Sequence, residues 1–230
     1  MSRHVLPVLL AGVAWCGAAW AGGQKEEALA DSVRTALSAA VGRAAPPTLV
    51  FADQSQQRQF DTWVQTTENR LLKKKPVELV RREFLQTVWY EAKRAGLDPG
   101  LVMGLIEVES GFRKYAISSV GARGYMQIMP FWSRSIGDGN ASSLFEMRTN
   151  LRFGCVILRH YLDIEKGNLF MALGRYNGSR GRAEYPNMVT ASWRRWKLPD
   201  AGVQMAQSDS GLSRRRGDLR SIENYRPAQL

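Results

Sequence analysis

The chain has 230 residues, of which 44% are hydrophobic and 23% are charged, a composition typical of a globular protein and unlike that of a disordered or collagen-like chain. Its 32 lysines and arginines exceed its 21 aspartates and glutamates, so polyanions such as nucleic acid, anionic lipid or acidic cell-wall polymers are the candidate partners. Two cysteines are too few for a disulfide framework and two histidines too few for a histidine-rich metal site, so we expect no metal and no zinc hydrolase chemistry.

Residues 1–21 are typical of a secretory signal peptide. Arg3 and His4 precede an apolar run over 5–19, and the sequence AWA at 19–21 has the small-x-small form of a cleavage site. The run is short for a transmembrane helix, so an uncleaved membrane anchor is the alternative and export to the periplasm is the prediction. Because an exported protein does not meet DNA in its normal work, we expect no nucleic-acid partner.

An N-terminal helical region is predicted over residues 22–75. Apolar residues at four-residue spacing over 24–42 indicate one face of an amphipathic helix, and Pro46-Pro47 breaks the chain after it. A second helix is expected from Phe60 to Leu71. The lysine run 73–75 is interpreted as the solvated end of that helix.

Residues 76–199 are predicted to form one all-α domain. Apolar periodicity indicates helices over 79–92, 150–166 and 170–176, and the Asp98-Pro99 pair is a good start for a further helix. Three glycines make 111–124 irregular, and no alternating pattern long enough for a sheet is present. The polar segment 200–230 is predicted to be a disordered, basic tail.

Glu109 stands out because helical geometry places it on an apolar face. At about 100° per residue, the apolar residues of the segment 101–108 form one stripe, and Glu109 lies in its middle while Glu107 lies on the opposite side. An ionised carboxylate facing an apolar interior is costly, so the pKa of Glu109 is expected to rise. A carboxylic acid that stays protonated near neutral pH can serve as a general acid. The alternative is a frayed helix end where Glu109 reaches water or a basic partner.

The sequence around Glu109 closely resembles the soluble lytic transglycosylase (SLT) domain. Glu109-Ser110 matches the family's Glu-Ser motif, Gly124-Tyr125-Met126-Gln127 its Gly-Leu-Met-Gln motif, and Arg175-Tyr176-Asn177 its Ala-Tyr-Asn motif, in the same order. The resemblance covers about residues 78–190 and implies a lysozyme-like, mostly α-helical fold. The chain departs from the family at three places. Tyr125 replaces the usual leucine, Arg175 replaces the usual alanine, and Arg113-Lys114 stands where Asn-Pro often follows the Glu-Ser motif.

By this resemblance Glu109 is the catalytic acid and base. Five further residues fall at positions that line the family's sugar-binding cleft, and Tyr176 among them would hydrogen-bond the catalytic carboxyl; they are Ser118, Gln127, Met129, Tyr176 and Asn177. The implied reaction cleaves the β-1,4 bond between N-acetylmuramic acid and N-acetylglucosamine and closes a 1,6-anhydro ring. It needs no organic cofactor. Arg113, Lys114 and Arg175 add positive charge near this cleft, which bears on the choice of substrate.

Ordinary glycosidases use two carboxylates. In this sequence, no acid after Glu109 lies in a motif that would place it opposite Glu109. Two other functions stay open: a hydrolytic muramidase on the same fold, and a wall-binding module without activity. Peptidoglycan glycan strands are the expected partner and a monomer the expected state. Proteins of the cell wall or of a secretion machine stay open as further partners.

Overall fold

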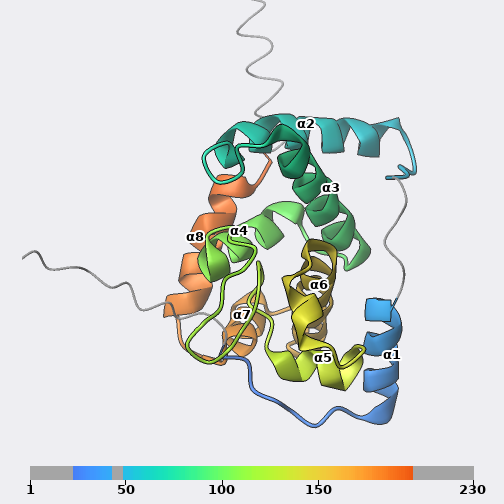
Figure 1. Ribbon diagram of the computed structural model, residues 1–230, viewed down its shortest axis with the longest axis vertical. Coiled ribbons are helices and arrows are strands. Elements are labelled where there is room, and N and C mark those ends of the chain that lie inside the picture. Colours follow the sequence, from blue (N-terminus) through green and yellow to red (C-terminus); the bar gives the residue numbers. More distant parts are fainter. Residues whose placement is uncertain (1–22, 43–48, 199–230) are drawn as a thin grey trace, which may run out of the picture.

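The computed structural model describes residues 23–42 and 49–198, and within them the fold is all-α, as predicted (Figure 1). Two isolated β-bridges, Ile117 to Arg123 and Arg123 to Ile128, interrupt this helical pattern. The elements in chain order are α1 (Asp31–Gly42), α2 (Gln54–Leu71), α3 (Glu78–Arg94), α4 (Pro99–Ser110), α5 (Pro130–Ile136), the 3-10 helix η1 (Ala141–Phe145), α6 (Met147–Ile164), α7 (Leu169–Asn177) and α8 (Glu184–Trp196). In this part of the chain, no helix is both long enough and apolar enough to span a bilayer.

Helix α4 is buried along almost its whole length. Asp98 caps it, since its carboxylate accepts a hydrogen bond from the backbone N–H of Leu101 at 2.9 Å, and Pro99 occupies the first turn, as the sequence predicts. Its most extensive partner is α8. Gly104 allows this close contact, because a Cβ there would lie 2.6 Å from the backbone nitrogen of Trp193. A helix buried in this way carries any polar side chain on it into the core.

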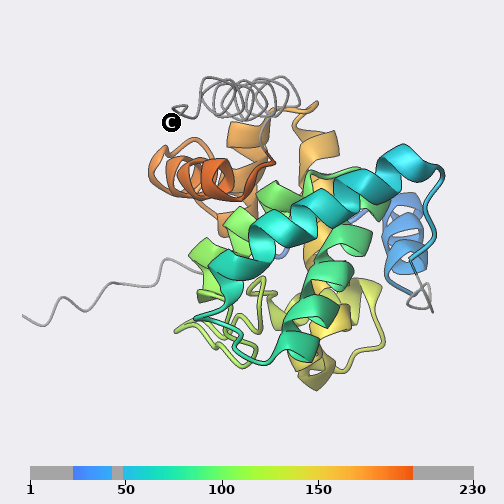
Figure 2. The same cartoon turned by 90° about the horizontal axis from the view of Figure 1, so that it is seen from above.

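The remaining helices are joined to the α4–α8 pair through α3 and α7. Helix α3 packs against α4 and α6, and α7 packs against α6 and α8. The two N-terminal helices also contact these elements: α1 lies against α5 and α6, and α2 lies on α3, crossing over the helices beneath it in Figure 2. The described part of the N-terminal region is therefore packed on the helices of the 76–199 segment.

Two local predictions for the N-terminal region are wrong. The first helix begins at Asp31 and not near residue 24, because the non-helical residues 23–30 contact Met129 and the end of α7 instead. Lys75 is not solvated: it is 7% exposed, and its Nζ lies 4.5 Å from the Phe84 ring centre and 2.7 Å from the Tyr125 hydroxyl. Tertiary packing overrides the local pattern at both places. The predicted signal peptide, and the predicted tail over 200–230, lie outside the described residues.

Candidate active site

Glu109 lies in the last turn of α4 and is buried, with 4% of its surface exposed, as the helical spacing predicts. Burial raises the pKa of its carboxyl to about 8, while a hydrogen bond from the Tyr185 hydroxyl lowers it to a smaller extent. The rise in pKa expected from the sequence is therefore confirmed. Glu109 is mostly protonated at neutral pH and can donate a proton.

The two carboxyl oxygens of Glu109 have different surroundings. Tyr185, at the start of α8 and 3% exposed, donates its hydroxyl hydrogen bond to Oε1. Oε2 is buried and has no hydrogen-bond partner among the described residues. Since Tyr185 donates to Oε1, the acidic proton belongs on Oε2, the buried oxygen that makes no hydrogen bond within the described residues.

The irregular segment 111–129 is fixed next to Glu109 by Ser110, of the Glu-Ser motif, and by Asn150, which the sequence did not indicate. The Ser110 hydroxyl donates to the carbonyl of Tyr125 at 2.7 Å. Asn150, fully buried on α6, accepts from the N–H of Met126 at 2.8 Å and donates to the carbonyls of Arg123 at 2.9 Å and Leu144 at 2.7 Å. One asparagine thereby bonds three backbone groups, two in the 123–126 segment and one in η1, which holds the segment in one conformation.

Gln127 and Ser118, both predicted to line a cleft, also stabilise this segment. The Gln127 backbone has a positive φ of 49°, and its carboxamide donates to the carbonyls of Ala116 at 3.1 Å and Gly124 at 2.9 Å. Ser118 is partly buried, and its hydroxyl accepts from the N–H of Ala122 at 3.1 Å. Their contacts within the described residues are therefore those of loop-forming residues.

Met129, Tyr176 and Asn177 each contact the segment before α1. Met129 is partly buried and precedes α5, while Tyr176 and Asn177 end α7 and are buried. Tyr176 lies close enough to Glu109 for the two groups to interact electrostatically: burial first, and then the Glu109 charge, raises the pKa of Tyr176 well above its ordinary value. Gln24, from the segment before α1, joins this group, with its Oε1 3.4 Å from the backbone nitrogen of Met129.

One predicted contact is wrong. Tyr176 does not hydrogen-bond Glu109; its hydroxyl donates to the carbonyl of Met126 at 2.8 Å, and Tyr185 is the tyrosine that bonds the carboxyl. The cause is helix geometry, since α8 presents Tyr185 to the end of α4 while Tyr176 points to the 123–128 loop. Little in the sequence indicates this role for Tyr185. In the sequence it is one more apolar position on the buried face of an amphipathic helix.

The other acids do not form a pair with Glu109. Burial and Tyr185 are the two influences on the pKa of Glu109, and no acidic group of the described chain is among them. Glu107, expected on the solvent side, is only partly exposed and binds α8 through Ser192, Arg195 and Trp196. Across residues 23–42 and 49–198, no group of three or more His, Cys, Asp or Glu side chains could hold a metal ion.

Trp193 and Trp196, in the last turn of α8 beside Arg194 and Arg195, are used in packing. The indole N–H of Trp193 donates to Asp98 at 2.9 Å, and that of Trp196 donates to Glu107 at 2.9 Å, so both tie α8 to α4. Trp196 is 5% exposed. A ring in this position is not available to stack on a nucleic-acid base.

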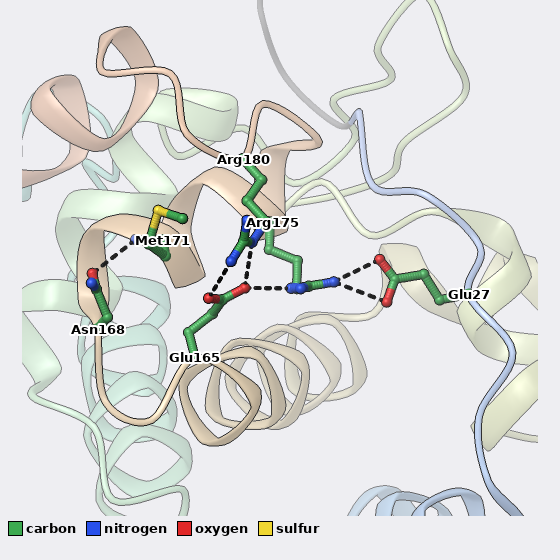
Figure 3. A network of polar contacts seen from close by, with 6 residues as sticks. All are labelled: Glu27, Glu165, Asn168, Met171, Arg175 and Arg180. Carbon is green, nitrogen blue, oxygen red and sulfur yellow. Dashed lines mark hydrogen bonds and ion pairs between the residues drawn. The ribbon is translucent and has the colours of Figure 1, made fainter.

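A second polar cluster surrounds Arg175, at the end of α7 (Figure 3). Its guanidinium pairs with Glu165 at 2.9 Å and with both oxygens of Glu27, at 2.8 and 3.0 Å. Arg180 also pairs with Glu165, at 2.7 Å. A pocket of about 420 Å³ beside Gly178 is lined by Glu27, Arg175 and Arg180 of this cluster, together with Lys25 and Arg182.

Comparison with known proteins gives one consistent family. Residues 86–192 match the family described as "Transglycosylase SLT domain". The chain is 33% identical over 103 residues to a transglycosylase of Enterobacteria phage PRD1, covering 45% of this chain and 37% of that protein. It is 41% identical over 120 residues to the membrane-bound lytic murein transglycosylase C of Haemophilus influenzae strain PittEE, covering 46% of this chain and 34% of that protein. The chain thus spans about a third of the length of these relatives.

Among solved structures, an inactive mutant of the lytic transglycosylase Slt from Pseudomonas aeruginosa is 27% identical to this chain. That similarity has a TM-score of 0.38 and covers 48% of this chain and 20% of the other.

Proposed function

Because residues 86–192 belong to the transglycosylase SLT family, we propose that the chain is a peptidoglycan lytic transglycosylase in which Glu109 is the single acid and base. The observation that carries this proposal is the buried Glu109 carboxyl, with Oε1 held by Tyr185 and Oε2 free of partners in the described structure. A carboxyl with a pKa of about 8 is protonated when it meets its substrate. It can therefore act first as an acid without help from a metal or cofactor.

In the first step, Oε2 of Glu109 donates its proton to the glycosidic oxygen between N-acetylmuramic acid and N-acetylglucosamine. The C1–O bond breaks, the N-acetylglucosamine leaves with a new hydroxyl, and positive charge develops at C1 of the muramic residue. The N-acetyl carbonyl of the same sugar can stabilise this centre. Tyr185 continues to donate to Oε1, which stabilises the carboxylate that remains.

In the second step, the Glu109 carboxylate takes the proton of the muramic C6 hydroxyl, whose oxygen bonds to C1. This closes the 1,6-anhydro ring, returns Glu109 to its protonated form and consumes no water. A hydrolase would need a second carboxylate to activate water, and no acid after Glu109 lies in a motif that would place one opposite it.

Five residues are proposed to contact the sugar or to shape the cleft that binds it. They are Ser118, Gln127, Met129, Tyr176 and Asn177. The excess of basic residues favours an acidic wall polymer, an attraction that salt weakens. Export through the predicted signal peptide would bring the protein to that polymer in the periplasm, as a monomer.

The experiment is to incubate the purified protein with peptidoglycan sacculi and to weigh the released muropeptides by mass spectrometry. Glu109→Gln is the test variant and Glu107→Gln the control, because both change one acid of α4. We expect products one water lighter than hydrolytic muropeptides from the wild type and from Glu107→Gln, and none from Glu109→Gln. Full-mass reducing products would indicate a muramidase. Binding to sacculi without release by any of the three proteins would indicate a wall-binding module.

A further inference from the structure

The segment before α1, residues 23–27, lies on the residues proposed to bind the glycan. In Figure 1 the chain leaves the start of α1 and runs along one edge of the molecule toward α7. It is non-helical, and it is followed by the first turn of α1 only at Asp31. We name residues 23–27 the N-terminal strap.

Three residues of the proposed cleft are in contact with the strap. Gln24 is 5% exposed, its Oε1 faces the backbone nitrogen of Met129 at 3.4 Å, and its carboxamide lies close enough to the Tyr176 hydroxyl to lower the pKa of that group. Gly23 is pressed against Asn177, since a Cβ at Gly23 would lie 2.3 Å from the Asn177 carbonyl oxygen.

An ion pair fixes the far end of the strap. Glu27 binds Arg175 through both carboxyl oxygens, and Arg175 is itself held by Glu165 (Figure 3). Arg175 directly precedes Tyr176 and Asn177 in α7. The Glu27–Arg175 ion pair and two residues of the proposed cleft therefore lie at the end of the same short helix.

From these contacts we propose that the N-terminal strap is an autoinhibitory cover, occupying the glycan cleft between Met129 and Tyr176–Asn177, and that it must leave before a glycan strand can enter. This inference rests on the proposed function. The Gln24 carboxamide, which faces Met129 and the Tyr176 hydroxyl, offers a carbonyl and an N–H, as the N-acetyl group of the substrate does, so it can occupy the same hydrogen-bonding positions.

Gly23→Ala tests the cover directly, because the closed position has no room for a methyl group at residue 23. Gly42→Ala is the matched control, since a Cβ at Gly42 meets nothing within 4 Å. We expect Gly23→Ala to speed hydrogen exchange at the amides of residues 24–30 and to raise kcat/KM on soluble glycan strands about tenfold, mostly through KM. Gly42→Ala should match the wild type in both measurements.

Glu27→Gln is the second variant, and Glu26→Gln, at the exposed neighbouring residue, is its control. The Glu27–Arg175 pair is partly exposed, so its loss should raise kcat/KM by about two- to threefold at low salt and by less at high salt, where screening already weakens the pair in the wild type.

The outcomes distinguish a failure of the cover hypothesis from a failure of the proposed function. A Gly23→Ala protein with faster exchange in the strap but unchanged or lower kcat/KM would overturn the proposal, since the strap would then be a wall of the cleft. Unchanged exchange would overturn it as well. If no variant cleaves glycan, the proposed function fails, and binding of tri-N-acetylchitotriose decides about the cover: tighter binding to Gly23→Ala than to Gly42→Ala supports it, and equal binding overturns it.

Discussion

The Tyr185 hydroxyl donates a hydrogen bond to Oε1 of Glu109, so that the carboxyl keeps one oxygen bound to protein and one oxygen without a partner in the described structure. The two residues come from the end of α4 and the start of α8, the two helices with the most extensive contact in the fold. The packing that buries Glu109 is thus the same packing that orients it.

Tyr185→Phe should lower kcat about tenfold with a smaller change in KM, because the carboxylate left after proton donation loses its hydrogen bond. The same hydrogen bond lowers the pKa of Glu109, so the alkaline limb of the pH–rate profile should move to higher pH in this variant. Tyr115→Phe, at an exposed tyrosine, is the control. A purely structural role for Tyr185 would reduce the rate and leave the alkaline limb in place.

The raised pKa of Glu109 also predicts how stability depends on pH. Its pKa is about 8 in the folded protein against an ordinary value of 4.5, so between these values the folded state binds more protons and the free energy of unfolding falls as pH rises. Glu109→Gln removes this dependence on pH. Urea unfolding should therefore show a free energy of unfolding higher than that of the wild type by on the order of 4 kcal/mol at pH 8, and little changed at pH 4.

Glu107→Gln provides a control of opposite sign. Although burial works in the other direction, hydrogen bonds from Ser192, Trp196 and Arg195 leave the pKa of Glu107 below its ordinary value. Its contribution to stability is therefore present at neutral pH and is lost as pH falls through the lowered pKa. This variant should be less stable than the wild type at pH 8. A gain in stability from both substitutions would contradict the account of α4.

Asn150→Ala should destabilise the protein by about 2–4 kcal/mol, since it removes the partner of the buried Met126 N–H and of the Leu144 carbonyl, and leaves the Arg123 carbonyl with the Ile128 N–H alone. It should also lower kcat, because the 123–128 loop packs beside Glu109. Asn168→Ala, which removes an exposed cap of α7, should cost about 1 kcal/mol and leave kcat close to that of the wild type. Equal losses of stability in urea unfolding would contradict the role of Asn150.

These residues also show what could be predicted from the sequence. The burial of Glu109 followed from helical spacing, and the start of α4 at Asp98-Pro99 followed from capping chemistry. Tyr185 and Asn150 could not be found in the same way, because each acts on a segment far along the chain and neither belongs to a local pattern that calls for a polar group. The strap was predicted as helix from its periodicity. Its contacts with Asn177 and Arg175 depend on tertiary structure, which a local pattern does not contain.

Lys75 is another residue whose burial could not be predicted from the sequence, and its burial also affects how stability depends on pH. Burial, and to a smaller extent the charge of Lys114, lowers its pKa from 10.5 to about 8. Between these values the folded state binds fewer protons than the unfolded state, so Lys75 makes the free energy of unfolding rise with pH. Lys75→Met should remove this rise between pH 8 and 10, whereas Lys74→Met, at an exposed position, should keep it. Identical pH dependence in the two variants would contradict the burial of Lys75.

The central claim is that Glu109 closes an anhydro ring without water. The most direct measurement is digestion of sacculi by the wild-type protein in water enriched in oxygen-18, followed by mass spectrometry of the released muropeptides. The account predicts products that contain no oxygen-18 at the muramic C1. Products carrying one oxygen-18 there would show that water attacks C1, and they would contradict the single-carboxyl mechanism.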